Sequence, residues 1–297
     1  MRNRVHARKA GLVVLFCLLC LVFCQPSAAG QWDRTPDITI GWTAWSDAEI
    51  VSKMATIILT RGMNYDVELT LADISVQYRG IAEGDLDAML MSWQPKTHQS
   101  YLKRYEGQLV DLGPVYEGAN LGWAVPEYVA DSVASIADLA KPAAKKLFGG
   151  KIQGIDASAG LMALSKKAID AYGIDYELLV ASGPAMARRL GEAVEEKSPI
   201  VVTGWRPHWM FAEYPIRYLE DPRGIFKSEE SVHVLARKGF EEDHPEVAAF
   251  FRRMHLKLDE LERLMVEARK TSHTEAVLDW IKRNPDRVRY WMRGKQE

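Results

Sequence analysis

Thiols are scarce in this 297-residue sequence and are confined to its beginning. The three cysteines, Cys17, Cys20 and Cys24, all lie within one apolar run. Their position indicates signal-peptide residues, although the first two have the spacing of a redox or metal pair. The rest of the chain therefore has no thiol for a disulfide or a metal, and we expect neither a metal nor another cofactor.

The sequence also lacks the short motifs that accompany common enzyme chemistry. It has no Gly-x-Ser-x-Gly nucleophile elbow, no His-Glu-x-x-His zinc motif and no glycine-rich phosphate loop. Carboxylates are plentiful, but spacing singles out no pair of them. We therefore assign no catalytic residue and expect the chain not to be an enzyme.

No apolar run is long enough to span a bilayer. The longest, Leu12–Cys24, has 13 residues, whereas a spanning helix needs about 20. Four basic residues precede this run, and the small residues Ser27 and Ala29 follow it. This layout predicts a cleavable signal peptide over residues 1–29, with a retained anchor as the alternative. We therefore expect a periplasmic protein.

Excess positive charge is absent as well. Without residues 1–29 the chain carries 34 basic and 40 acidic side chains, a net charge of about −6 with neutral histidines. This balance does not attract nucleic acid, so we expect no nucleic-acid partner. The roughly 268 remaining residues exceed one typical domain and suffice for two lobes, each with its own core. We expect a monomer.

Strand and helix patterns alternate along the chain in two series. Strands are predicted at 37–42, 65–71, 87–93, 118–125, 151–155, 176–180 and 199–205. Helices are predicted at 46–62, opened by a Ser46–Glu49 capping box, and at 73–84, 136–146, 158–172, 184–196, 245–254, 258–270 and 274–282. The alternation predicts an α/β fold with two similar lobes facing each other across a cleft. We assign residues 30–124 and 216–297 to the first lobe and 125–215 to the second.

Tryptophans stand at the ends of three predicted strands: Trp42 and Trp45, Trp93, and Trp205. Ligands of open α/β sheets lie outside the carboxyl ends of the strands. A trimethylammonium group has no N–H donor, but aromatic faces attract it by about 0.5 to 2 kcal/mol each. The pattern therefore predicts an aromatic cage for a quaternary-ammonium solute, with packing in the lobe cores as the alternative for each tryptophan.

Two histidines, His98 and His208, closely follow the last two of these strand ends. Each could donate an N–H to a carboxylate of the same solute, and so could the helix starts near Ser46 and Ser158. Asp47 is a candidate for contact with a hydroxyl or the cation. Its other interpretation, which we favour, is a first-turn charge that complements the helix dipole.

Several segments resemble one family of transport proteins. They are 93–98 (WQPKTH), 112–114 (LGP), 117–119 (EGA), 200–211 (IVVTGWRPHWMF), 219–222 (LEDP) and 234–240 (VLARKGF). They are similar to the substrate-binding proteins of glycine betaine, choline and proline-betaine ABC transporters, the OpuAC/ProX-like family. The resemblance covers nearly all of the chain after residue 29, and 203–211 is its most specific part.

The resemblance implies a type II periplasmic-binding-protein fold, whose lobes close over the ligand, and delivery to an ABC permease in the inner membrane. It implies a tryptophan cage at Trp93 and Trp205, extended to Trp45. It also implies a carboxylate-binding histidine at His208. In choline-selective relatives a Trp-x-Asp at the first strand end is used, and Trp45 with Asp47 is similar to it.

One turn departs from the family pattern. Many members have Asp-Pro-Gly-Ala-Gly or a tryptophan-bearing version there, whereas this chain has Asp-Ala-Ser-Ala-Gly at 156–160. The cage is then completed by Trp45, Trp42 or Tyr116. The departure leaves the ligand open between glycine betaine, choline and their analogues. A receptor for a membrane sensor and a secreted enzyme acting on a choline compound are the alternative functions.

Overall fold

The computed structural model describes residues 36–129 and 132–294, so the predicted signal peptide lies outside the described residues. Nine strands pair in the order β2-β1-β3-β9-β4-β7-β5-β6, and β8 pairs with β4. The strands are β1 (Ile38–Trp42), β2 (Val67–Leu71), β3 (Ala88–Gln94), β4 (Leu109–Pro126), β5 (Lys151–Gln153), β6 (Glu177–Leu179), β7 (Val202–Arg206), β8 (Ile216–Tyr218) and β9 (Glu230–Arg237).

A single long strand, β4, connects two sheets. It pairs with antiparallel β9 up to Ala119 and with antiparallel β7 from Asn120 onward. We call lobe 1 the part built on β2, β1, β3, β9 and the first half of β4. Lobe 2 is the part built on the second half of β4 with β7, β5, β6 and β8. The predicted two-lobed α/β fold is confirmed, and the exact lobe bounds stay a prediction.

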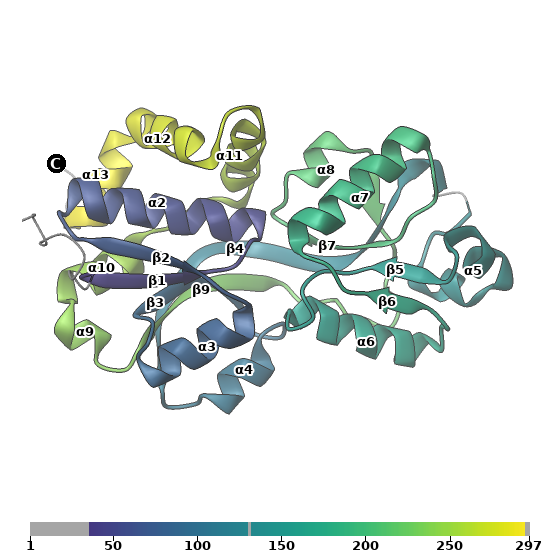
Figure 1. Cartoon of the computed structure of the whole chain (residues 1–297), viewed down its shortest axis with the longest axis horizontal. Helices are drawn as coiled ribbons and strands as arrows, with labels where there is room; N and C mark the ends of the chain where they lie inside the picture. The colour runs from purple at the N-terminus through teal and green to yellow at the C-terminus, as the bar shows by residue number, and fades with distance from the viewer. Residues whose placement is uncertain (1–35, 130–131, 295–297) are drawn as a thin grey trace, which may run out of the picture. The chain divides into compact units, whose positions relative to one another are not determined.

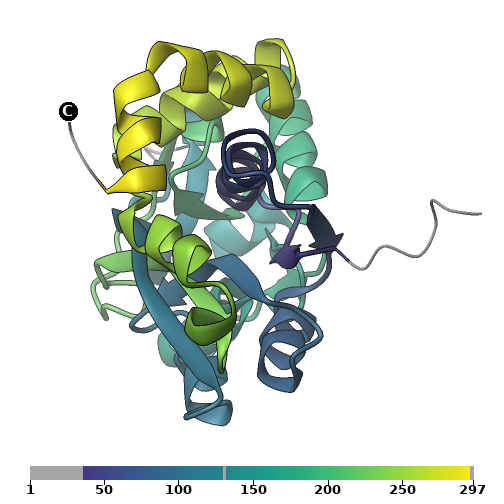
Figure 2. The ribbon, with the colours of Figure 1, turned by 90° about the vertical axis from the view of Figure 1, so that its left-hand side faces the viewer.

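Helices cover both faces of each sheet. They are α2 (Ser46–Gly62), α3 (Ile74–Glu83), α4 (Gln99–Arg104), α5 (Pro142–Phe148), α6 (Gly160–Tyr172), α7 (Gly183–Glu196), α8 (Met210–Glu213), α9 (Phe240–Asp243), α10 (Pro245–Arg253), α11 (Leu258–Lys270), α12 (His273–Arg283) and α13 (Pro285–Arg293). In Figure 1, α2 and α3 lie on opposite faces of the lobe 1 sheet, and α7 and α6 do the same in lobe 2. Figure 2 shows the C-terminal helices α11 and α12 lying over α2. Among the residues described, no helix is long and apolar enough to cross a bilayer.

Helix α2 shows how the sequence pattern produces the packing. Ile50, Met54 and Ile58 recur at every fourth position and are buried against the sheet. The predicted capping box at its start is wrong. The N-cap is Trp45, and Ser46 is already helical, with a hydroxyl that has no partner among the described residues. An N-cap serine bonds the orphan amides only from outside the helix, so Ser46 cannot take this role.

The ends of β1, β3 and β7 bring the tryptophan positions to the junction of the lobes. Trp45 follows β1, Trp93 lies near the end of β3, and Trp205 lies near the end of β7. Leu121 of β4 is the strand partner of Trp205. The crossing strand therefore sets the position of one indole relative to the other lobe.

Trp123 provides a test of the lobe 2 core. Its side chain is fully buried on β4, and its Nε1–H donates to Ser165 Oγ on α6 at 2.9 Å. We expect Trp123→Ala to lower the free energy of unfolding by about 3–5 kcal/mol. We expect Ser165→Ala to lower it by about 1–3 kcal/mol, because the buried indole N–H loses its acceptor. Urea denaturation measures both, with the exposed Ser132→Ala as control, and an effect of Ser165→Ala no larger than that of the control would contradict the assignment.

Candidate functional site

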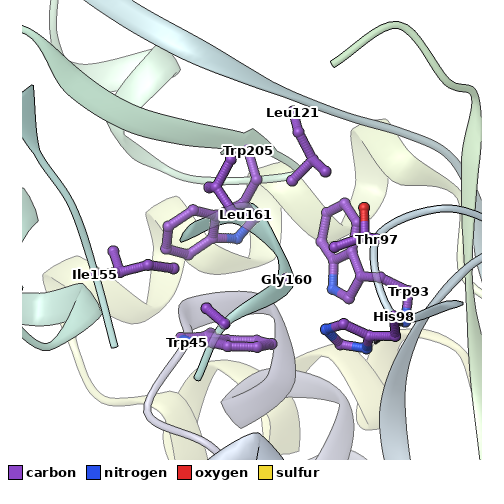
Figure 3. Close-up of a pocket in the computed structure, with 10 residues that line it drawn as sticks. Trp45, Trp93, Thr97, His98, Leu121, Ile155, Gly160, Leu161 and Trp205 are labelled. Atoms are coloured by element: carbon purple, nitrogen blue, oxygen red, sulfur yellow. Dashed lines mark hydrogen bonds between the residues drawn. The ribbon is translucent and has the colours of Figure 1, made fainter. Parts of the chain in front are cut away.

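A small cavity, partly open to solvent, lies between the two lobes. Residues of both lobes line it: Trp45, Trp93, Thr97, His98, Leu121, Ile155, Ala159, Gly160, Leu161 and Trp205. In Figure 3 the three indoles stand on different sides of this space. The structure thus brings together the three tryptophans that the sequence places at separate strand ends.

The three indoles are nearly fully buried, and Trp45 and Trp205 do not stack on one another. Trp45, Trp93 and Trp205 are 5%, 2% and 3% exposed. The ring centroids of Trp45 and Trp205 lie 6.4 Å apart with the planes tilted by 58°. Because the rings are splayed, their faces are not consumed by stacking and can contact a guest. Among the described residues no lysine or arginine lines this cavity, so a cation within it meets no like charge from them.

His98 contributes an unused hydrogen-bond donor to the wall of the cavity. Its Nδ1 accepts the backbone N–H of Trp93 at 3.1 Å. In the neutral ring the hydrogen then resides on Nε2, and this atom is buried without a partner among the described residues. Burial lowers the pKa of His98 to about 3, so the ring is neutral near pH 7. A buried, unpaired N–H is costly, and a bound acceptor would remove that cost.

The N-terminus of α6 supplies further donors. Gly160 and Leu161, its first two residues, line the cavity. The first amides of a helix have no intrahelical acceptor and carry the positive end of the helix dipole. Within the described part of the chain these two amides have no hydrogen-bond partner. The cavity therefore combines an aromatic region with a region of donors that suits an anion.

Asp47 and Tyr116 lie behind the indoles and do not line the cavity. Asp47 is fully buried, and its two carboxylate oxygens accept from Trp205 Nε1 at 2.9 Å and from the Tyr116 hydroxyl at 2.6 Å. Burial raises the pKa of Asp47, and the hydrogen bonds from Tyr116 and Trp205 oppose this rise. The ring of Tyr116 meets that of Trp93 edge-on, at 6.5 Å and 84°. Both residues are thus placed to support the indoles from outside.

His208 and Trp42 also lie outside the cavity wall. His208 Nδ1 accepts the backbone N–H of Met210 at 3.1 Å, and its ring meets Trp205 edge-on at 4.6 Å. Burial, followed by the charge of Arg269, lowers the pKa of His208 to about 3. Trp42 is half-buried against the core. Of the two candidate histidines, the cavity is therefore lined by His98 and not by His208.

The sequence prediction missed the aliphatic and small residues of the wall. Leu121, Ile155 and Leu161 also line the cavity, and Thr97 adds a hydroxyl that is buried without a partner among the described residues. Their aliphatic side chains resemble any core residue in sequence. Only Thr97 carried a signal, because it directly precedes His98. In the described chain, no group of three His, Cys, Asp or Glu side chains could hold a metal ion.

The sequence of this chain matches a known family of binding proteins. Residues 36–283 match the family described as the substrate-binding domain of the ABC-type glycine betaine transport system. The chain belongs to this family. It is therefore related to the binding components of transporters, as the resemblance in its sequence suggests.

Individual relatives agree with that assignment. The glycine betaine/carnitine transport binding protein GbuC of Listeria monocytogenes is 36% identical over 162 residues, which cover 52% of this chain and about half (54%) of that protein. Lactococcal OpuAC, solved in a closed conformation with glycine betaine, is 32% identical with a TM-score of 0.80, covering 86% of this chain and 99% of that one. The glycine betaine/L-proline-binding protein ProX of Borrelia burgdorferi is 30% identical with a TM-score of 0.80, covering 86% and 96%.

The two buried histidines predict a loss of stability in acid. Their folded pKa values of about 3 lie below the value of about 6.5 in an unfolded chain. Unfolding therefore takes up protons below pH 6.5, so the full stability is present above pH 6.5 and is lost as the pH falls toward 3. Each histidine adds a slope of up to about 1.4 kcal/mol per pH unit.

Urea denaturation between pH 7.5 and pH 4.5 measures this slope. His98→Gln and His208→Gln are each expected to unfold with a shallower dependence on pH than the unchanged protein. Parallel slopes in all three proteins would contradict the neutral, buried state of these rings.

Proposed function

We propose that this chain is the exported, periplasmic solute-binding protein of an ABC uptake system, and that its ligand is a small quaternary-ammonium solute, with glycine betaine preferred over choline. One observation carries the proposal. Three indoles from two lobes surround a cavity whose remaining wall offers N–H donors that have no partner in the described part of the chain. A methylated ammonium joined to a carboxylate needs both regions at once.

The ammonium half of such a ligand is suited to the indole region. Its charge is spread over methyl groups that cannot donate conventional hydrogen bonds, so a cage of carboxylates would gain little specificity. Indole is the most favourable aromatic face for a cation, and the attraction strengthens when water is excluded. The low exposure of Trp45, Trp93 and Trp205 provides that exclusion.

The carboxylate half is suited to the donor region. His98 Nε2–H and the amides of Gly160 and Leu161 are unpaired among the described residues, and together they can satisfy several lone pairs of a carboxylate. The single hydroxyl of choline would leave part of these donors unpaired, at a cost of roughly 1–3 kcal/mol for each buried group. This difference is the reason to place glycine betaine before choline. Lactococcal OpuAC, which is 32% identical to this chain, was solved with glycine betaine bound, and this supports a ligand of that class.

The position of the cavity supports a closing mechanism. Trp45 and Trp93 belong to lobe 1. Trp205 belongs to lobe 2, and so do Gly160 and Leu161, which begin its helix α6. A ligand that contacts both lobes favours the closed state over the open one by the difference in its binding free energy. The closed surface is then what an ABC permease in the inner membrane recognises. We propose that the protein acts as a monomer in this role.

A thermal-shift screen tests the function directly. Glycine betaine, proline betaine, carnitine, choline and dimethylsulfoniopropionate are each added to the purified protein. A ligand that binds only the native state raises the melting temperature, and glycine betaine is expected to raise it most. No shift with any of the five would overturn the proposal, and a larger shift with choline would overturn the preference.

Substitutions at the cage distinguish the two halves of the site. Trp93→Ala and Trp205→Ala are each expected to weaken glycine betaine binding at least about tenfold, on the order of 1.4 kcal/mol or more. His98→Ala should weaken glycine betaine binding more than choline binding, because only the carboxylate loses a donor it needs. Calorimetry measures all three.

Trp42→Ala is the matched control, since its indole lies outside the cavity wall. It is expected to leave the affinity within about threefold of the unchanged protein, which is below 1 kcal/mol. Equal losses for Trp42→Ala and Trp93→Ala would mean that the indoles act through general packing and not as a cage.

A further inference from the structure

Two of the indoles donate hydrogen bonds across the junction of the lobes, and they do so reciprocally. Trp45, from lobe 1, donates its Nε1–H to Asp156 Oδ2 at 3.0 Å, and Asp156 belongs to the β5–α6 loop of lobe 2. Trp205, from lobe 2, donates its Nε1–H to Asp47 Oδ1 at 2.9 Å, and Asp47 belongs to α2 of lobe 1. Each lobe therefore holds an indole of the other.

Neither carboxylate is neutralised by a basic side chain. Among the described residues, no lysine, arginine or histidine forms an ion pair with Asp47 or Asp156. Apart from the bond to Trp45, no side-chain hydrogen bond of Asp156 is present in the part of the chain that the structure describes. A hydrogen bond to an ionised acceptor is roughly twice as strong as a neutral one.

Beside these two hydrogen bonds the lobes are in close contact, so the bonds can exist only when the lobes are closed. A Cβ added to Gly160 of α6 would lie 2.2 Å from the carbonyl oxygen of Thr97, so only glycine fits there. The Tyr101 hydroxyl donates to the carbonyl of Ser158 at 2.8 Å in the same region. Separation of the lobes would therefore break both indole bonds together and leave Trp45 and Trp205 free to change rotamer.

We propose that Asp156 and Asp47 form a reciprocal latch, in which Asp156 is the positioning residue for Trp45 and Asp47 is the positioning residue for Trp205. The proposal rests on the proposed function and deepens it. Closure of the lobes and completion of the cage become one event, because each indole reaches its final orientation only when the opposite lobe supplies its acceptor. The latch acts only in the closed state, which the ligand-free protein also samples, so it mainly slows opening and dissociation and changes association little.

Asp156 is the residue to change, because it lies on a loop and is less buried than Asp47. Stopped-flow tryptophan fluorescence with glycine betaine gives the association and dissociation rates separately. Asp156→Ala is expected to raise the dissociation rate at least about tenfold, with the association rate within about twofold. Asp156→Asn keeps a neutral acceptor and is expected to raise the dissociation rate by about threefold.

Asp170→Asn is the matched control, an exposed aspartate on α6 in the same lobe, and it is expected to keep both rates of the unchanged protein. Small-angle scattering of the ligand-free protein reads the latch without a ligand, and Asp156→Ala is expected to populate a wider arrangement than Asp170→Asn.

The outcomes separate the two proposals. If the unchanged protein binds glycine betaine but Asp156→Ala and Asp170→Asn dissociate at the same rate, the latch is overturned and the function stands. If the unchanged protein binds none of the quaternary ammonium solutes, the function is overturned, and identical scattering of the two variants would then overturn the latch as well.

Discussion

The contact between flat indole faces and a cation that cannot donate hydrogen bonds is the interaction on which the proposed function depends. Such a contact contributes appreciably to the binding free energy only if the rings are fixed, splayed and shielded from water. In this chain Trp45, Trp93 and Trp205 come from three strand ends in two lobes and are nearly fully buried. The lobed architecture is what allows rings so distant in sequence to surround one small space.

The surroundings of the indoles explain how their orientation is kept. Polar edges of Trp45 and Trp205 are bonded to carboxylates, and Tyr116 supports both Asp47 and Trp93. The cavity wall also carries N–H donors that have no partner among the described residues. Because burying an unpaired donor is unfavourable, these groups are more easily understood as parts of a binding site than as parts of a core.

Much of the fold could be predicted from periodicity, and the exceptions have physical reasons. Helix α11 has the predicted bounds of 258–270, and strand β3 is the buried run that its apolar residues indicate. Strand β9 (Glu230–Arg237) was not predicted, although it lies between β3 and β4. Its half-buried positions, such as His233, interrupt the apolar pattern, and its place depends on antiparallel pairing with partners more than 100 residues away.

By itself the sequence determined the class of fold, the family and the residue types from which the site is built, because strand-end tryptophans and the segment 203–211 are local features of the chain. Only the tertiary structure decided which of these residues meet. It placed His98 on the cavity wall and His208 outside it, and it directed Asp47 and Asp156 toward the indoles of the opposite lobes. Those choices depend on strand register and on the distance between the lobes, which are set by packing across the whole chain and have no local signature.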